Sequence, residues 1–582
     1  MYLAELHIYE FRKLKAATIQ FQPGLNVIVG PNNVGKTAVV DALRALLAGP
    51  DEPFLRLSDD DIHAPKGGAR AGAITFKYVF RDLSADDEAD FLAGLRPALD
   101  GKMEATVGVT YGDPDQAGRL RVRRWCGDHD DVPLTPDMLE NLRGVYLPPL
   151  RDAAQGLRPS RTSQLARLIQ LLSDQSGRDA IDAALAKLDD DLKKHAPLVT
   201  TEKSIVDRHA AMLGPQLIQT LAIGLSVSDF QRLAARLSLL VDDFEIEMNG
   251  LGFNNLIFMA VVLSELAKNP DAAFRGLIIE EPEAHLHSQL QSVLLRYLSA
   301  IPIGKDEKPV QVFVTSHSPH FASIARLDCL SCLFDANAGI ETFFPRQLKF
   351  QPGKKEKLER YLDVTRAEIF FARRVIFVEG AAELLLVNVL AEKGGFNLRH
   401  HAVSLISVEG LNFDSFMPLF GEAALKLPVA VVTDADPVNT PAEGEEAVPV
   451  YPAAGDPITV SANTASMKKL EDKYMKVFHG AKTLEYDLAL IPEMRPLMLE
   501  ALKELHPVVG GMLETAVAAA RTDAEKAKVL FSGMFERPSN NVQKGRFAQT
   551  LAARIAATKV PIPVPGYILA AVRHACQITE GP

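Results

Sequence analysis

The feature that most constrains the fold is a glycine-rich loop near the start of the chain, Gly30-Pro-Asn-Asn-Val-Gly35-Lys36-Thr37. It satisfies the pattern G-x-x-x-x-G-K-[ST], follows the apolar run LNVIVG, and precedes a segment (35–48) with helical spacing. Glycines let the backbone curl so that N–H groups point at phosphate oxygens, and the following helix N-terminus favours an anion. The motif therefore predicts a strand, a phosphate-binding loop and a helix. The predicted nucleotide contacts are Gly30, Asn32, Asn33, Gly35, Lys36 and Thr37, with Lys36 directed at the β- and γ-phosphates and Thr37 at Mg²⁺.

Two apolar strands far downstream end in residues that complete such a site. The segment GLIIEEPEAHLH (276–287) predicts a buried strand that ends in Glu280 and Glu281. An acidic residue at this place can hold Mg²⁺, and a second beside it can orient the attacking water, so we assign Glu280 to the metal and Glu281 to the water. His317 follows the strand VQVFVTS (310–316), where a histidine can contact the γ-phosphate.

The set of motifs resembles a known kind of ATPase. Asn249, Gly250 and Gly252 precede a helix and resemble a degenerate ABC signature, the element that caps ATP bound by the opposite subunit. The order of all these motifs along the chain resembles that of ABC ATPases of the RecF and SMC type. The segments EEPEAHLH and VTSHSP are similar to those of ATPase heads in the overcoming-lysogenisation-defect (OLD) family. The resemblance implies a sandwich of two copies, and so a homodimer or larger assembly. The helical region at 155–240 is expected to be an insertion that serves dimerisation.

A second α/β series begins near residue 370. Strands are predicted at RRVIFVEG (373–380), VSLISVEG (403–410) and PVAVVTDAD (428–436). Residues 437–465 are predicted to be a loop, and the Ala-rich stretch 515–528 a helix. The fold class is therefore α/β: an ABC-type ATPase head with a helical insertion (1–370), followed by an α/β domain with a parallel sheet (371–582).

Carboxylates gather at the strand ends of this second series. One glutamate ends a strand and another follows four residues later on the same helical face. Two aspartates, two residues apart, share a face of another strand. Carboxyl ends of parallel strands meet in one crevice, and massed negative charge there calls for Mg²⁺ or Mn²⁺. The candidate metal ligands are Glu379, Glu383, Asp434, Asp436 and Glu485, and Lys544 is the candidate cation for a scissile phosphate.

Taken singly these motifs are weak, but their order resembles the Toprim domain of topoisomerases, primases and OLD nucleases. Glu383, Glu485 and Lys544 extend the resemblance to the two-metal OLD site, in which two cations about 4 Å apart serve phosphodiester hydrolysis. With the head, the resemblance covers nearly the whole chain. It implies a metal-dependent DNA endonuclease that nicks or cuts duplexes, uses ATP, and acts in DNA processing or phage defence.

Two other functions stay open. One is an ABC-type DNA repair or clamp protein whose Toprim-like half binds DNA without cutting it. The other is a topoisomerase or primase, although a topoisomerase would need a large gate domain with a strand-linking tyrosine.

Composition narrows the setting of the protein. The net charge of −11 argues against a protein coated in nucleic-acid-binding surface. Basic segments at 119–123 and 346–360 are either local contacts with nucleic acid or solvated faces. Four cysteines, no apolar run of membrane-spanning length and a charged start predict a cytoplasmic protein without disulfides, in which Cys329 and Cys332 are buried.

Overall fold

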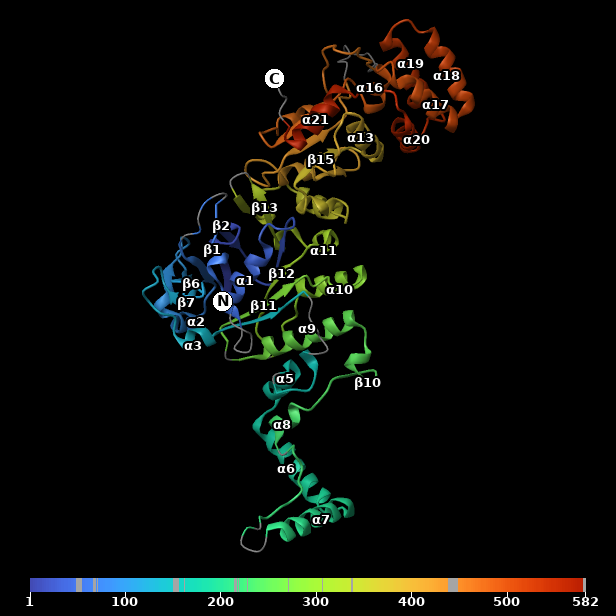
Figure 1. Ribbon diagram of the computed structural model, residues 1–582. Coiled ribbons are helices and arrows are strands. Elements are labelled where there is room, and N and C mark those ends of the chain that lie inside the picture. The colour runs from blue at the N-terminus through green and yellow to red at the C-terminus, as the bar shows by residue number, and fades with distance from the viewer. Residues whose placement is uncertain are drawn as a thin grey trace. The chain divides into compact units, whose positions relative to one another are not determined.

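The computed structural model describes residues 1–48, 55–65, 68, 70, 72–149, 156–161, 163–213, 217, 219–227, 229–270, 272–305, 307–336, 339–437 and 449–578 (Figure 1). The chain forms two compact units. The first comprises Met1–Phe11, Phe21–Asn26 and Thr37–Thr315, and the second Arg12–Gln20, Val27–Lys36 and Ser316–Pro582. The boundary predicted near residue 370 lies inside the second unit and stays a prediction.

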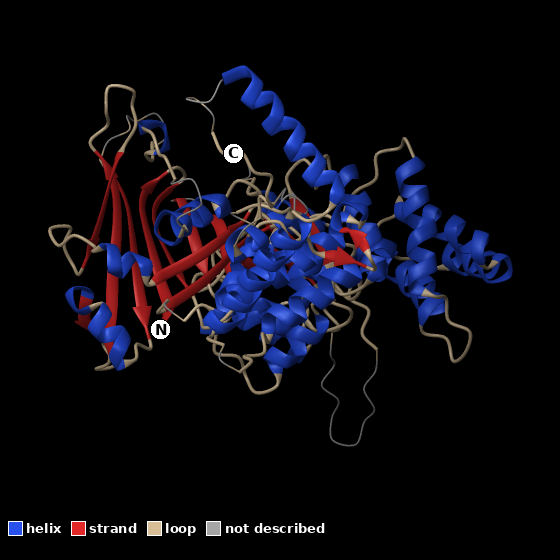
Figure 2. Ribbon diagram, turned by 90° about the horizontal axis from the view of Figure 1, so that it is seen from below, coloured by secondary structure: helices blue, strands red, loops and turns tan. Residues whose placement is uncertain are grey.

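An antiparallel sheet occupies one part of the first unit, and Figure 2 shows its long strands beside the N-terminus. Alternate residues of its first strand are buried, as a sheet with one covered face requires. Leu6 pairs with Tyr78 and Ile8 with Phe76, all fully buried. Its strands are β1 (Tyr2–Phe11), β4 (Ile74–Arg81), β6 (Met103–Gly112), β5 (Leu95–Pro97) and β7 (Arg121–Cys126), and β2 (Leu14–Gln20) joins them beside β1.

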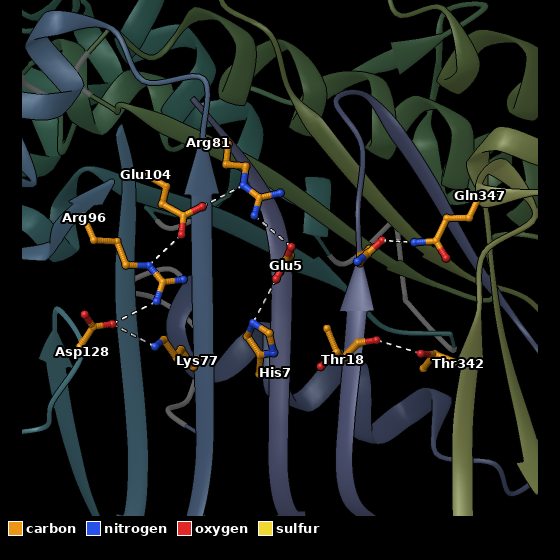
Figure 3. Close-up of polar contacts among 11 residues, drawn as sticks. Glu5, His7, Thr18, Lys77, Arg81, Arg96, Glu104, Asp128, Thr342 and Gln347 are labelled. Atoms are coloured by element: carbon orange, nitrogen blue, oxygen red, sulfur yellow. Dashed lines mark hydrogen bonds and ion pairs between the residues drawn. The ribbon is translucent and has the colours of Figure 1, made fainter. Parts of the chain in front are cut away.

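Charged side chains form a ladder across this sheet (Figure 3). Arg81 bridges Glu5 at 3.0 Å and Glu104 at 2.9 Å. Arg96 continues the ladder from Glu104 at 2.7 Å to Asp128 at 3.0 Å. Cross-strand pairs of opposite charge stabilise a sheet, and here they also neutralise Arg81 and Arg96.

A parallel group of buried strands carries the rest of the first unit. β11 (Phe274–Glu280) pairs in parallel with β8 (Leu142–Leu147) and with β12 (Gln311–Thr315). The helix α1 (Lys36–Leu47) approaches β8 closely, because a Cβ at Gly144 would overlap the carbonyl oxygen of Leu47. The strands predicted at 276–281 and 310–316 and the helix at 35–48 are thus confirmed within one or two residues. The other helices here are α2 (Ala85–Asp90), α3 (Pro136–Glu140), α9 (Leu251–Lys268) and α10 (Ser288–Ser299).

In the region 155–240, predicted to be a helical insertion, the described residues include the helices α5 to α8, whereas 219–227 form neither helix nor strand. Figure 1 shows α6 and α7 lying beyond α5 and α8, away from the strands of this unit. No residue of α7 is buried, and Val199, Ile205 and Met212 expose apolar side chains. The elements are α5 (Gln164–Leu172), α6 (Gln175–Leu192), α7 (Ala196–Leu213), α8 (Phe230–Ala234), β9 (Leu240–Val241) and β10 (Phe244–Glu245).

One helix differs from the sequence expectation about membranes. Among the described residues, α9 alone is long and apolar enough to cross a bilayer by length and composition. Of that window 44% is buried inside the protein, and core helices of soluble proteins meet the same criterion. All four cysteines are buried and unpaired, which confirms the expectation for Cys329 and Cys332.

The second unit begins with β2 (Leu14–Gln20) and most of β3 (Leu25–Val29). β3 pairs in parallel with β13 (Leu330–Ala336), which pairs antiparallel with β14 (Gly339–Phe343). β3 therefore belongs to a different sheet from β1, so the first thirty residues contribute strands to two sheets.

A four-stranded parallel sheet organises the remainder of this unit, in the order β16-β15-β17-β18. Its central strands are wholly or mostly buried, as expected for a parallel sheet covered on both faces. The predicted parallel α/β domain is confirmed, although β18 was not foreseen. The strands are β15 (Arg374–Val378), β16 (Val403–Ser407), β17 (Val429–Val432) and β18 (Met475–Phe478), and α13 (Ala381–Lys393) and α21 (Gly566–Cys576) pack beside them.

Helices close the second unit. The stretch 515–528 is not one helix, because α18 ends at Ala519 and Thr522 caps α19 by accepting from the N–H of Glu525. Part of the predicted loop, residues 438–448, lies outside the described residues, and α15 begins at Ala462. The remaining helices are α11 (Pro319–Ile324), α12 (Lys354–Tyr361), α14 (Phe413–Phe416), α15 (Ala462–Lys468), α16 (Leu484–Leu490), α17 (Met494–Leu505), α18 (Pro507–Ala519), α19 (Asp523–Phe535) and α20 (Lys544–Ala557).

Candidate functional site

The glycine-rich loop has the conformation that its sequence predicts. Gly30 has φ 153° and Gly35 φ 93°, both in the region that glycine favours, and a Cβ at Gly30 would overlap the carbonyl of Leu333. Lys36 is only 4% exposed, and its Nζ donates to the carbonyl oxygens of Gly30 at 2.5 Å and Pro31 at 2.9 Å. The loop thus wraps around its own lysine.

The other predicted contacts of this loop lie on its open side. Asn32, Asn33 and Thr37 are exposed, and Asn33 has φ 70°. The Asn33 carbonyl accepts from Lys13 Nζ at 3.1 Å, which ties the loop to the exposed end of β2. These groups are therefore accessible to a phosphate and its cation.

Glu280, at the end of β11, belongs to a buried chain of contacts. Tyr146 of β8 donates its hydroxyl to Glu280 Oε2 at 2.5 Å, and burial raises the pKa of Glu280. Arg44 lies 4.0 Å above the Tyr146 ring and bonds Asp41 Oδ1 at 3.1 Å. Sequence reasoning missed Tyr146, Arg44 and Asp41. The spacing of Asp41 and Arg44 on α1 was a usable signal, but nothing in the sequence paired Tyr146 with Glu280.

The chain turns sharply after β11. Glu281 has φ 44°, and its N–H donates to the Thr315 carbonyl at 3.0 Å. The signature segment packs against this turn, since a Cβ at Gly252 would lie 2.7 Å from the carbonyl of His285. Gly250 is the N-cap of α9, and Asn249 Nδ2 donates to Asn254 at 3.0 Å.

His317, predicted to contact the γ-phosphate, lies in the connection between β12 and α11. Its side chain is exposed.

Four of the five predicted carboxylates of the second half are brought together. Glu379 follows β15, and its Oε1 accepts from Thr433 Oγ1 at 2.6 Å and from the N–H of Asp434 at 2.8 Å. These bonds join the ends of β15 and β17. Glu383, in the first turn of α13, accepts from the N–H of Gly380 at 2.9 Å.

Glu485 meets Lys544 inside this cluster. Its side chain is 1% exposed, and Oε2 accepts from Lys544 Nζ at 3.1 Å and from Thr483 Oγ1 at 3.0 Å. Its other oxygen, Oε1, is buried without a hydrogen-bond partner among the described residues. An uncompensated buried carboxylate oxygen is costly, so this atom favours an added cation.

The pKa shifts within the cluster also favour an added cation. Burial, followed by the charges of Glu379 and Glu485, raises the pKa of Asp434 well above its usual value. Burial also raises the pKa of Glu383. Burial alone would lower the pKa of Lys544, but Glu485 and Asp434 outweigh it and raise that pKa. The carboxylates repel one another, and a single lysine offsets them only in part.

Asp436 differs from the expectation that it shares a face with Asp434. β17 ends at Val432, so strand alternation does not extend to these residues. Asp436 has φ 41°, and its side chain is exposed. The N–H of the intervening Ala435 donates to the Lys482 carbonyl at 2.8 Å.

Two residues beside the cluster were not predicted from the sequence. Asp487 Oδ1 accepts from the N–H of Ala481 at 2.8 Å and of Lys482 at 3.4 Å, and burial raises its pKa to about 7. Burial, followed by the charges of Asp487 and Asp434, raises the pKa of Tyr567. Asp487 lies two residues after Glu485 in LEYDL, but only the fold reveals that its carboxyl is buried.

Gly480 gives a test of this packing. A Cβ there would overlap Asp487 Oδ2 and lie 2.8 Å from the Tyr567 ring. We expect Gly480→Ala to lower the free energy of unfolding by roughly 1–3 kcal/mol, because the crowded carboxyl is held by two N–H groups. Gly511→Ala is the control, since nothing lies near its Cβ within α18, and it should stabilise by about 0.5–1 kcal/mol. Equal urea midpoints for the two variants would contradict the packing around Asp487.

The cluster suits a divalent cation by its chemistry. Hard cations prefer carboxylate oxygens, and the unpartnered Glu485 Oε1 supplies one. Among the described residues, no three histidine, cysteine, aspartate or glutamate side chains are already arranged to hold a metal ion.

Fold and family matches together define a class of protein: an ATPase domain followed by a Toprim domain. Residues 1–212 and 151–322 match the AAA ATPase domain family, over more than half of the chain. Residues 370–436 match the family described as overcoming lysogenization defect protein-like, TOPRIM domain. The chain therefore belongs to the AAA ATPase domain family over its first half, and its second half carries a segment similar to the OLD-type TOPRIM domain.

Named relatives are similar to parts of the chain. The chain is 26% identical to the OLD nuclease of Thermus scotoductus (strain ATCC 700910 / SA-01) over 418 residues, which cover 67% of this chain and 74% of the relative. It is 24% identical to Endonuclease GajA of Bacillus cereus (strain HuB5-5) over 213 residues, or 32% of this chain and 30% of that protein. A solved C-terminal region of the Xanthomonas campestris pv. campestris OLD protein is 26% identical, with coverage of 36% of this chain and 96% of that one and a TM-score of 0.25.

Proposed function

We propose that the protein is a DNA endonuclease that hydrolyses phosphodiester bonds with two divalent metal ions and is coupled to an ATP-hydrolysing head. The observation that carries the proposal is the cluster of Glu379, Glu383, Asp434 and Glu485 around Lys544, in which Glu383 and Glu485 are buried and the other two carboxylates are half-buried. The nuclease names of two relatives support the same reaction class. Phage defence or DNA repair is the corresponding role, and four unpaired cysteines suit a cytoplasmic protein.

Each residue of the cluster has a distinct part in this proposal. Glu379, Glu383, Asp434, Asp436 and Glu485 would hold the metal ions, Mg²⁺ or Mn²⁺, and Asp436 would turn inward to do so. When bound, such ions activate water and stabilise the leaving oxygen of an in-line displacement. Lys544 offsets charge on the scissile phosphate, and Thr483 and Lys544 together orient Glu485.

The head is proposed to bind MgATP. Lys36 and the N–H groups of its loop hold the phosphates, while Thr37 and Glu280 hold Mg²⁺. Glu281 orients the attacking water, and His317 contacts the γ-phosphate. Tyr146, which bonds Glu280, positions that carboxylate.

A plasmid assay tests the proposal. Purified protein is incubated with supercoiled plasmid in EDTA, Mg²⁺ or Mn²⁺, each with and without ATP. We expect nicked or linear product only with metal. If the protein retards plasmid but leaves it intact under every condition, it is instead a DNA-binding repair or clamp ATPase.

The signature segment predicts the assembly. If Asn249, Gly250 and Gly252 cap ATP bound by another copy, the protein is at least dimeric when it hydrolyses ATP. We expect ATPase activity per molecule to rise with protein concentration, and light scattering to give a dimer or larger species. A monomer whose specific activity is independent of concentration would rule out the two-copy site.

A further inference from the structure

The basic segments recognised in the sequence are partly neutralised by carboxylates: in 119–123, Arg123 lies 3.5 Å from Asp130, whereas Arg119 and Arg121 are exposed. In residues 346–360, Lys354 pairs with Asp414, Lys355 with Asp328 at 2.5 Å, and Lys357 with Asp414 at 3.8 Å. The arginines in Figure 3 are likewise neutralised by carboxylates of their own sheet. These side chains are therefore compensated by carboxylates of the protein itself.

A pocket of about 470 Å³ lies beside the start of α20. It is formed by the corner between α17 and α18, the segment 537–543, and the first turn of α20. No carboxylate lines it, although the protein has 74 acidic and 63 basic residues. Its polar lining consists of donors and amides: His506, Arg537, Asn540, Asn541, Gln543 and Arg546.

The two arginines of this pocket are not neutralised. Within the part of the chain that the structure describes, neither Arg537 nor Arg546 is paired with a carboxylate. Arg537 Nε is buried without a hydrogen-bond partner, and its Nη2 reaches only backbone carbonyls, including that of Ser539 at 3.3 Å. Arg546, in the first turn of α20, is exposed. Two guanidinium groups without anions favour an oxyanion between them.

The beginning of α20 adds to this preference. Gln543 is the N-cap residue, but its side chain makes no capping hydrogen bond, so first-turn N–H groups remain available. The first residue of the same turn, Lys544, donates to Glu485 of the carboxylate cluster at 3.1 Å. Side chains two residues apart on a helix point to different sides, so Lys544 and Arg546 lie on opposite sides of the first turn of α20.

We propose that this pocket binds a backbone phosphate of the DNA substrate and so holds the strand across the start of α20 while Lys544 faces the scissile phosphate. The inference rests on the proposed nuclease function and extends it with a substrate-binding site. Its ligand is a phosphodiester within a strand, because the pocket lies next to a cluster proposed to cut inside DNA. A phosphomonoester at a strand end and free inorganic phosphate share the same chemistry.

Binding measurements in EDTA test the pocket apart from catalysis. Wild type, Arg546→Ala and Arg546→Lys are titrated with a fluorescent closed circular duplex over a range of salt concentrations. Arg521→Ala is the control, since Arg521 is exposed, unpaired with a carboxylate among the described residues, and outside the pocket. We expect Arg546→Ala to weaken binding by roughly tenfold and to reduce the slope of log Kd against log salt by about 0.9, with Arg546→Lys between it and wild type.

Each outcome decides the proposal. Equal affinity and slope for wild type and Arg546→Ala would overturn it, as would equal losses in Arg521→Ala and Arg546→Ala. A linear duplex is tested with and without a 5′-phosphate: if Arg546→Ala loses affinity only for the phosphorylated duplex, the pocket binds strand ends. Inorganic phosphate is tested at constant ionic strength: if it binds and DNA does not, the pocket binds free phosphate. Either result overturns the phosphodiester assignment. Parallel cleavage assays distinguish the phosphate-binding proposal from the nuclease proposal. If the wild-type protein binds DNA through Arg546 but never cuts it, only the nuclease proposal is refuted.

Discussion

Asp434→Ala is expected to lower DNA cleavage by about 10³-fold while ATP hydrolysis continues. A loss of about 4 kcal/mol of transition-state stabilisation has this effect, and removal of a metal ligand is of that size. Asp434 lies at the centre of the cluster: its N–H donates to Glu379, and its Oδ1 accepts from the N–H of Leu484 at 3.2 Å. The measurement is the rate of plasmid nicking in Mg²⁺ and Mn²⁺, beside phosphate release from ATP.

Stability distinguishes a lost ligand from a lost fold. Burial and neighbouring carboxylates raise the pKa of Asp434, so its ionised form is unfavourable in the folded protein. Its removal should therefore leave the thermal midpoint unchanged or raise it, as at many strained active sites. Lys544→Ala is the companion variant: cleavage should fall by roughly 10²–10³-fold while calorimetric Mn²⁺ binding persists. Wild-type cutting by Asp434→Ala would show that the Toprim nuclease assignment is wrong.

The sequence predicted the parts of this site that depend on short-range pattern. Buried parallel strands are continuous apolar runs, so β11, β12 and β15 were placed within two residues, and β17 begins within one residue of its predicted start but ends four residues earlier than predicted. Their ends then located Glu280, Glu379 and Asp434. β18 was missed because its sequence, MKVF, is short and includes a lysine. The break between α18 and α19 was missed because the alanines around it favour a helix, although Thr522 is a typical N-cap residue.

What the sequence did not predict depends on long-range packing. Tyr146 bonds Glu280 across 134 residues, and Lys544 bonds Glu485 across 59. The lysine was found because the family resemblance marked it, whereas Tyr146 had no such motif. Asp487 and Asp436 each lie two residues from a predicted ligand, yet the first is buried and the second exposed. Spacing alone could not separate these cases, because burial is decided by segments distant in sequence.

Lys36→Ala is expected to reduce ATP hydrolysis by at least about 10³-fold. Lys36 Nζ is held inside the loop by the carbonyls of Gly30 and Pro31, where it is nearly inaccessible to water. A cation so placed by the protein compensates the charge of the β- and γ-phosphates without reorganisation, and its loss removes that stabilisation. The measurement is phosphate release over a range of ATP concentrations, together with binding of a fluorescent ATP analogue.

The loop offers a matched control for this prediction. Lys13 also contacts it, but from an exposed position, through the Asn33 carbonyl at 3.1 Å. Lys13→Ala should therefore retain most of the ATPase activity, since an exposed contact contributes little. Glu281→Gln should bind the analogue normally and turn over slowly, because a neutral amide orients water poorly. If Lys36→Ala hydrolyses ATP as fast as Lys13→Ala, the glycine-rich loop does not hold the phosphates; if only Lys36→Ala loses both binding and turnover, the buried lysine is the residue that neutralises them.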